Sequence, residues 1–239
     1  MIVSHARRFI FLKTQKTGGS SVELALSEIC GPEDVITPLP AEDEALRTGR
    51  GPQNCEIAAG RRPWWSGPAR LVGVSDRRAG AVFSEHMNAK QVRRAVGPDV
   101  FDRYLKATIV RNPWDREVSL YFWHTRGMDR PPSFDEFVRR RLSRPERKTW
   151  EIYAIGDRCV ADVVMRYERL DEDFTAFLQR VGHDGTLTLP RAKGAYRPEK
   201  KRDYRELYTA ETAEIVRDRY AREIAYFGMT FDGEAAAAT

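Results

Sequence analysis

A nine-residue stretch with two adjacent glycines, residues 13–21, constrains the fold of this chain more than any other part of it. The apolar run Phe9–Leu12 precedes this stretch and predicts a buried strand. Apolar residues then recur at the spacing of one helix face, at Val22, Ala25, Leu26 and Ile29. A strand, a glycine-containing loop and a helix in this order present backbone N–H groups to an anion. The sequence therefore predicts a phosphate-type loop at the edge of an α/β sheet.

The residue types inside this stretch suit an anion. Gly18 and Gly19 lack the Cβ atoms that would keep a phosphate away from the backbone. Lys16 adds a mobile positive charge, and Ser20 and Ser21 add hydroxyl donors. These side chains predict contacts to a phosphate-like group.

An ordinary strand-to-helix turn is the alternative interpretation of the same residues. In that case Ser20 is the N-cap of the helix, and Glu23, three residues later, completes a capping box. Such turns are common, so this stretch alone does not separate the two interpretations.

A second strand-to-helix junction lies in the middle of the chain. The β-branched run Leu105–Val110 predicts a strand, and Arg111 follows it directly. Asn112 suits the N-cap, Pro113 the first helical position and Asp115 the capping partner. An arginine at such a turn can bind a phosphate through two parallel hydrogen bonds. The alternative is a structural Arg111 that pairs with a carboxylate.

A histidine marks a third junction. The short apolar run 81–83 leads into Glu85 and His86, and Asn88 is a candidate cap for the helix that follows. Such junctions are where α/β proteins gather their chemistry. A lone histidine is more often structural, so the position of His86 is the reason to consider it.

Length, punctuation and charge bound the class of protein. The 239 residues fit one domain over 1–232, with a loop-rich insertion at about 33–80 that contains Trp64 and Trp65, and a disordered tail over 233–239. The two tryptophans either line an acceptor pocket or pack the insertion onto the core. The formal net charge of +5 favours anionic partners, but no aromatic–basic motif for nucleic acid is present.

The cysteines and the apolar runs indicate a compartment. Three widely spaced cysteines fit neither a disulfide framework nor a zinc site, so we expect a reduced cytoplasm. Every apolar run is far shorter than the ~20 residues of a membrane span. Residues 1–8 lead into no long apolar region, so we expect no cleaved signal peptide.

The two junctions together resemble the sulfotransferases that use 3′-phosphoadenosine-5′-phosphosulfate (PAPS), above all their carbohydrate-type branch. Residues 11–21 are similar to the 5′-phosphosulfate loop of that family, and residues 110–121 are similar to its 3′-phosphate element. Weaker likeness continues through residues 167–170 and 227–231. Gln15 stands where the family often has proline. The loop is not a Walker A motif, because its lysine precedes the glycine pair.

The resemblance implies a three-layer α/β fold, with a P-loop-like central parallel sheet flanked by helices. It implies transfer of a sulfuryl group from PAPS to a hydroxyl or amine of a carbohydrate or other small molecule, in line and without a metal. The product would be adenosine 3′,5′-bisphosphate. Two separate turns would then converge on opposite ends of one nucleotide.

The resemblance also implies a role for each matching residue. Lys16 would neutralise the leaving oxygen, and Arg111 and Ser119 would hold the 3′-phosphate. His86 would be the general base, with Glu85 as the alternative. The remaining candidates bind the nucleotide: Thr17, Gly18, Gly19, Ser20 and Ser21 through the 5′-phosphate, and Lys193, Gly194 and Arg197 in a basic loop whose match is looser.

Two other classes of function stay open. A nucleotide kinase or triphosphatase disagrees with the order of lysine and glycines, and no carboxylate for magnesium is evident. A non-catalytic protein of the same fold would bind an anion or a glycan without turnover. Neither the acceptor nor the oligomeric state follows from the sequence.

Overall fold

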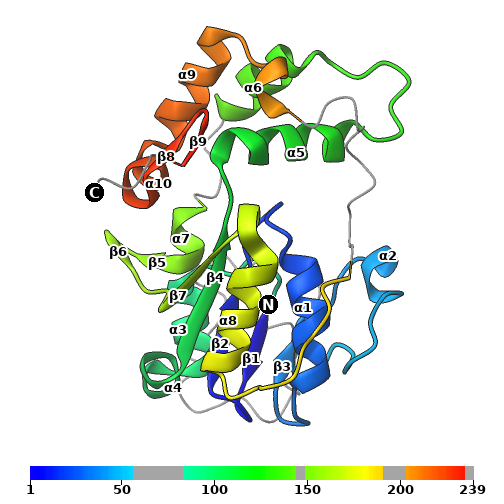
Figure 1. Cartoon of the computed structure of the whole chain (residues 1–239), viewed down its shortest axis with the longest axis vertical. Helices are drawn as coiled ribbons and strands as arrows, with labels where there is room; N and C mark the ends of the chain where they lie inside the picture. Colours follow the sequence, from blue (N-terminus) through cyan, green and yellow to red (C-terminus); the bar gives the residue numbers. More distant parts are fainter. Residues whose placement is uncertain (56–82, 144–148, 191–202, 235–239) are drawn as a thin grey trace, which may run out of the picture. The chain divides into compact units, whose positions relative to one another are not determined.

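The computed structural model describes residues 1–55, 83–143, 149–190 and 203–234, and it divides into two compact units (Figure 1). The first unit contains residues 1–109 and 151–192, and the second contains residues 110–150 and 193–239. Each unit has a buried hydrophobic cluster of its own. The single domain expected over residues 1–232 stays a prediction.

The first unit is built on a five-stranded sheet whose strand order is β3-β1-β2-β4-β7. The strands of this sheet are β1 (Ile2–Ser4), β2 (Phe9–Leu12), β3 (Val35–Ile36), β4 (Leu105–Val110) and β7 (Val163–Arg166). Its α-helices are α1 (Gly19–Leu26), α2 (Ala41–Glu44), α3 (Ala89–Val96), α4 (Pro98–Arg103) and α8 (Leu170–Arg180), while α7 (Trp150–Tyr153) begins at the unit boundary. A small hairpin, β5 (Ala154–Ile155) and β6 (Arg158–Cys159), and two 3₁₀ turns, Ser27–Ile29 and Tyr167–Arg169, complete it.

The α/β prediction is confirmed, with a mixed sheet in place of the parallel one expected. Strands β2 and β4 are parallel, with Phe9 opposite Leu105. Strand β1 is antiparallel to both β2 and β3. The turn between β1 and β2 has only four residues, 5–8, and a turn this short joins antiparallel strands, because parallel neighbours need a crossover of a dozen or more residues.

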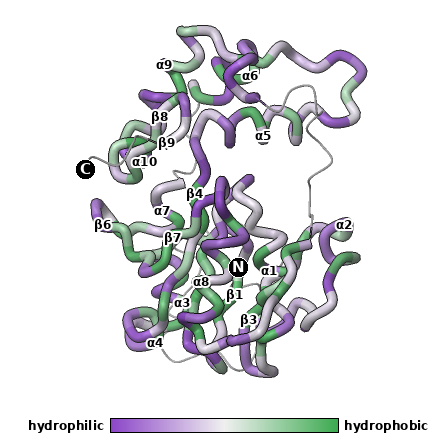
Figure 2. The backbone as a smooth tube through the Cα atoms, viewed as in Figure 1, coloured by the Kyte–Doolittle hydropathy of each residue, from purple (hydrophilic) through white to green (hydrophobic). Residues whose placement is uncertain are grey.

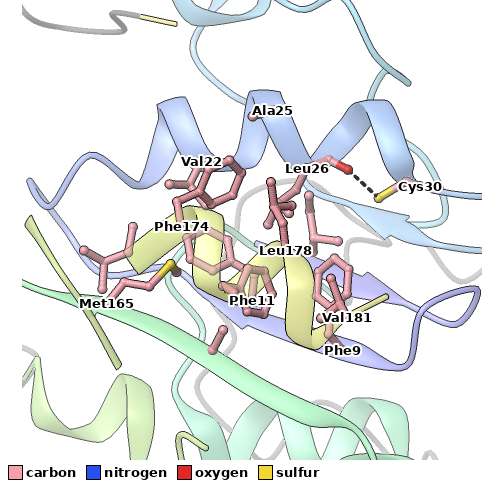
Figure 3. Close-up of a cluster of buried hydrophobic side chains, with 14 of the residues drawn as sticks. Phe9, Phe11, Val22, Ala25, Leu26, Cys30, Met165, Phe174, Leu178 and Val181 are labelled. Atoms are coloured by element: carbon pink, nitrogen blue, oxygen red, sulfur yellow. Dashed lines mark hydrogen bonds between the residues drawn. The ribbon is translucent and has the colours of Figure 1, made fainter. Parts of the chain in front are cut away.

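Helices α1 and α8 cover one face of this sheet (Figure 3). Side chains alternate between the two faces of a strand, so Phe9 and Phe11 of β2 point to the same side. The ring of Phe9 meets that of Phe177 edge to face at 5.5 Å. The cluster also contains Ala107 and Ile109 of β4, Val22, Ala25 and Leu26 of α1, and Phe174, Phe177 and Leu178 of α8. Figure 2 shows hydrophobic colour around β3 and α1, in keeping with this buried side.

A third layer lies on the opposite face. Lys106 of β4 points away from its neighbour Ala107, and its ammonium group contacts the ring of Phe101 in α4. The same ammonium donates to the backbone oxygens of Phe101 and Tyr104 and pairs with Asp162 at 2.8 Å. Helices therefore flank both faces of the sheet, as the three-layer prediction requires.

The second unit is mainly helical. It contains α5 (Pro113–Thr125), α6 (Phe134–Leu142), α9 (Ala210–Arg219), α10 (Ala221–Phe227), a 3₁₀ turn at Tyr204–Leu207 and the hairpin of β8 (Met229–Thr230) and β9 (Gly233–Glu234). Trp114, Val118, Phe134, Val138, Leu142 and Val216 form its buried cluster. The sequence also predicts one last helix, with Thr209 as its cap and Gly228 as its stop. In the structure this helix breaks at Tyr220 into α9 and α10. Among the helices that the structure describes, none combines the length and the apolar character needed to cross a membrane.

Candidate functional site

The loop after β2 is held in place by two threonines. The hydroxyl of Thr14 donates to the backbone oxygen of Ile109, at the end of β4, over 2.5 Å. It also lies 2.8 Å from the hydroxyl of Thr17, and all three residues are buried. Because β2 and β4 are neighbours in the sheet, this contact fixes the loop against the edge where both strands end.

The backbone of this loop enters the left-handed region twice. Lys16 has a φ of 58° and Gly18 a φ of 79°. A lysine rarely adopts this conformation, so the loop holds Lys16 in a costly backbone geometry. Left-handed residues within such a turn direct successive N–H groups into one concavity, which suits an anion. Gly18 then begins α1, whose first turn carries no charged side chain.

Both glycines are required by close neighbours. A Cβ atom on Gly18 would lie 2.9 Å from Cδ2 of Leu170, and a Cβ on Gly19 would lie 2.9 Å from Cγ of Lys13. Neither distance is tolerated without a shift of the neighbour. Packing against Leu170 and Lys13 therefore gives a reason for glycine at both positions, while the approach of a phosphate that the sequence predicts there stays a prediction.

The capping-box interpretation of this turn is wrong. The N-cap of α1 is Gly18, and no side chain of the described residues caps it. Ser20 and Ser21 lie buried in the first turn of the helix. Glu23 points elsewhere, and its carboxylate accepts a hydrogen bond from Thr37 at 2.9 Å. The same carboxylate pairs with the ammonium of Lys13 at 3.0 Å.

His86 lies beside the entry to the loop, ahead of α3. Its Nδ1 is 2.9 Å from the backbone oxygen of Lys13, and its Nε2 is 3.5 Å from Oε2 of Glu85. Asn88 caps α3 with a complete capping box, as its sequence position predicts. The helix after His86 begins where the sequence predicts it, while residues 81 and 82 of the predicted strand lie outside the described residues. The structure adds the contact of His86 with the loop.

Burial lowers the pKa of His86 from 6.5 to about 4. The positive charge of Lys13 lowers this pKa further, while the hydrogen bond to the Lys13 carbonyl and the negative charge of Glu85 raise it. The imidazole is therefore neutral at pH 7, which is the state that a base needs before it accepts a proton.

Arg111, in the second unit, is already paired with a carboxylate. Its Nε and NH2 each lie 2.7 Å from Oδ2 of Asp115. Asn112 caps α5 through the N–H of Trp114, so Asp115 pairs with Arg111 where the sequence predicted a capping partner. Asp115 and Ser119 are four residues apart in α5, so they lie on one face of that helix.

The structure places the remaining candidates as follows. Lys16 is half-buried in the loop, and Thr17 is fully buried beneath it. The loop residues and His86 belong to the first unit, while Arg111 and Ser119 belong to the second. Their convergence on one nucleotide therefore stays a prediction. Lys193, Gly194 and Arg197 lie outside the described residues, as do Trp64 and Trp65.

Sequence reasoning missed the roles of Lys13 and Glu23. Lys13 holds both His86, through its backbone, and Glu85, through its side chain at 3.1 Å. These partners are more than 70 residues away in the sequence, so no local pattern indicates them. A charged residue between a buried strand and a glycine loop was the one available signal.

Comparison with known proteins gives a family and one curated relative. Residues 1–231 match the model of the sulfotransferase family. An uncharacterized protein of Archaeoglobus fulgidus is 30% identical over an alignment of 107 residues, and the match covers 40% of this chain and 82% of the relative. No solved structure matches the chain.

Proposed function

This chain belongs to the sulfotransferase family, and we propose that it moves a sulfuryl group from PAPS to a hydroxyl or amine of a carbohydrate or another small molecule. The loop before α1 is the observation that carries this proposal. It combines left-handed backbone at Lys16 and Gly18, an uncharged first helical turn and a firm attachment to β4. A loop with these features can bind a phosphate or sulfate group through its backbone N–H groups.

The loop is proposed to hold the 5′-phosphosulfate end of the donor. The backbone N–H groups of Thr17 to Ser21 would bind the phosphate at the N-terminus of α1, because a helix N-terminus favours negative charge. Lys16 neutralises the charge that develops on the leaving oxygen as the sulfuryl group departs. Positioning and charge stabilisation account for most of the catalysis in transfers of this kind.

Arg111 and Ser119 are proposed to hold the 3′-phosphate. The ion pair with Asp115 fixes the guanidinium at the start of α5. An arginine at a strand-to-helix turn can bind a phosphate through two parallel hydrogen bonds. Selection of the 3′-phosphate would distinguish PAPS from ordinary adenylates.

His86 is proposed to accept the proton of the acceptor hydroxyl. Its ring is neutral near pH 7, and it lies at the mouth of the same loop as Lys16. Glu85 is the alternative base. A histidine with a depressed pKa takes the proton as the hydroxyl attacks, and returns it readily to solvent afterwards.

A paired experiment tests the proposal. The protein is incubated with PAPS and a metabolite extract, and mass spectrometry follows acceptors that gain a sulfate group. Thermal shift with adenosine 3′,5′-bisphosphate and with ATP is measured alongside. A sulfated product and a larger shift with the bisphosphate support the proposal. A larger shift with ATP would indicate a kinase or triphosphatase. A bisphosphate shift without any product across a broad panel would indicate a non-catalytic binder.

A further inference from the structure

We propose that Lys13 is a positioning residue that makes His86, rather than Glu85, the proton acceptor. Its backbone fixes the tautomer of the imidazole, and its ammonium forms an ion pair with the carboxylate of Glu85 beside the ring. This inference rests on the proposed function, because it names which side chain of that site takes the proton. It is carried by contacts within the first unit alone.

The backbone of Lys13 selects the tautomer of His86. A carbonyl oxygen can only accept a hydrogen bond, and the Lys13 carbonyl lies 2.9 Å from Nδ1 of His86. Nδ1 must therefore carry the hydrogen, and in a neutral ring Nε2 then keeps its lone pair. The nitrogen left to accept a proton is Nε2.

The side chain of Lys13 forms an ion pair with Glu85. Its ammonium lies 3.1 Å from Oε2 of Glu85, the same oxygen that lies 3.5 Å from Nε2 of His86. One oxygen of Glu85 therefore lies between the ammonium of Lys13 and the ring of His86. Its negative charge there favours the imidazolium that forms when Nε2 takes a proton.

Glu23 keeps the ammonium of Lys13 in this place. The Lys13 and Glu23 side chains are 3% and 0% exposed, and they lie 3.0 Å apart. Glu23 is in turn anchored by the hydroxyl of Thr37. The ammonium is therefore shared between a fully buried carboxylate behind it and Glu85 in front of it.

The charged groups that face His86 determine whether its pKa rises or falls when Lys13 is replaced. They are the ammonium of Lys13, the α-amino group of Met1 and the carboxylate of Glu85. Burial lowers the pKa of the Met1 amine to about 6, so this amine is positive in the acid range where His86 titrates. Removal of the Lys13 charge takes away one of these positive groups and leaves the Glu85 carboxylate without its ammonium partner. The imidazolium is then favoured, so the pKa of His86 must rise.

Nuclear magnetic resonance reads both features without any turnover. The full chain is labelled with ¹⁵N-histidine, and His86 is assigned among four histidines with the His86→Gln variant. We expect a neutral ring with hydrogen on Nδ1, titrating well below 6.5. Hydrogen on Nε2, or a pKa near 6.5, would overturn the proposal.

Three variants separate charge from packing. In Lys13→Met the pKa of His86 should rise by about one unit or more, and in Lys13→Arg it should stay near the wild-type value. Lys106→Met is the matched control, since it also removes a buried lysine paired with a carboxylate in the same unit, and it should leave His86 unchanged. Equal titration of His86 in wild type and Lys13→Met would overturn the proposal.

A charge change at Glu85 and the pH profile of kcat/KM also test the role of Lys13. If Lys13→Met does not fold, Glu85→Gln replaces it: loss of that negative charge must lower the pKa of His86, and a rise would overturn the proposal. In the active protein, the acid limb of kcat/KM should follow the His86 titration in each variant. Absence of any sulfated product would overturn the proposed function, while the titrations would still decide the role of Lys13.

Discussion

Lys13 Nζ lies 3.0 Å from Glu23 Oε2, and water reaches almost none of either side chain. The pair joins the end of β2 to the second turn of α1, on either side of the glycine loop. Burial alone would raise the pKa of Glu23, but the nearby Met1 amine and Lys13 lower it to about 2. The anchor of the loop therefore depends on a carboxylate that stays ionised inside the protein.

From the lowered pKa of Glu23 we predict how the free energy of unfolding changes in acid. The folded pKa of Glu23 is about 2, below its ordinary value of 4.5, so the unfolded chain binds the proton more tightly. The stabilisation is fully present above about pH 4.5 and is lost as the pH falls toward 2. Glu23→Gln should lower the free energy of unfolding at pH 7 by about 3 kcal/mol, because it leaves Lys13 buried without its partner.

Urea unfolding at a series of pH values measures this effect. The difference between wild type and Glu23→Gln should shrink as the pH falls from 4.5 toward 2. Glu33→Gln, an exposed carboxylate of the same unit, is the control and should keep the wild-type profile. A constant difference across that pH range would show that folding does not lower the pKa of Glu23.

Lys16→Ala tests the catalytic charge of the loop. Alanine carries a Cβ as lysine does, so the substitution leaves the left-handed backbone at this position about equally strained. Transfer from PAPS should nearly vanish, because the charge on the leaving oxygen is no longer neutralised. Lys90→Ala, an exposed lysine of α3, should keep full rate. Normal turnover by Lys16→Ala would end the assignment.

Gly18→Ala separates a steric requirement from backbone strain. Gly18 and Gly228 both have left-handed backbone, at φ 79° and 62°, so alanine costs about 1 kcal/mol or more at each. At Gly18 the new Cβ also meets Leu170 at 2.9 Å, while at Gly228 no described residue lies within 4 Å. Gly18→Ala should therefore be the less stable variant, and it should also weaken binding of adenosine 3′,5′-bisphosphate. Equal losses of stability by thermal unfolding would contradict the contact.

The sequence predicts those features of the molecule that depend on residues close together in the chain. The caps at Asn88 and Thr209 and the stop at Gly228 follow from side chains within three residues or from one glycine, and all three are confirmed. The loop of residues 13–21 follows from the order of strand, glycines and helix. These features depend on neighbours in the chain, so a pattern can show them.

Features that depend on distant partners were missed. Strand β1 has three residues, too few to show a period, so the antiparallel edge of the sheet gave no signal. Glu23 fits the pattern of a capping box, but two buried positive groups offer it stronger partners. Asp115 differs from Glu23, because it pairs with Arg111 only four residues away, and the sequence had left a pair between Arg111 and a carboxylate open.

Arg111→Ala tests the second turn. Affinity for adenosine 3′,5′-bisphosphate should fall by about 2–3 kcal/mol, the range for a lost hydrogen bond between charged groups, as measured by calorimetry. Asp115→Asn separates binding from structure, since it removes the ion pair of 2.7 Å but keeps the guanidinium. If Arg111 only stabilises α5, both variants lose thermal stability and neither loses affinity. If it binds the 3′-phosphate, Arg111→Ala loses far more affinity than Asp115→Asn, and Arg93→Ala, which breaks an exposed pair with Asp102, loses none.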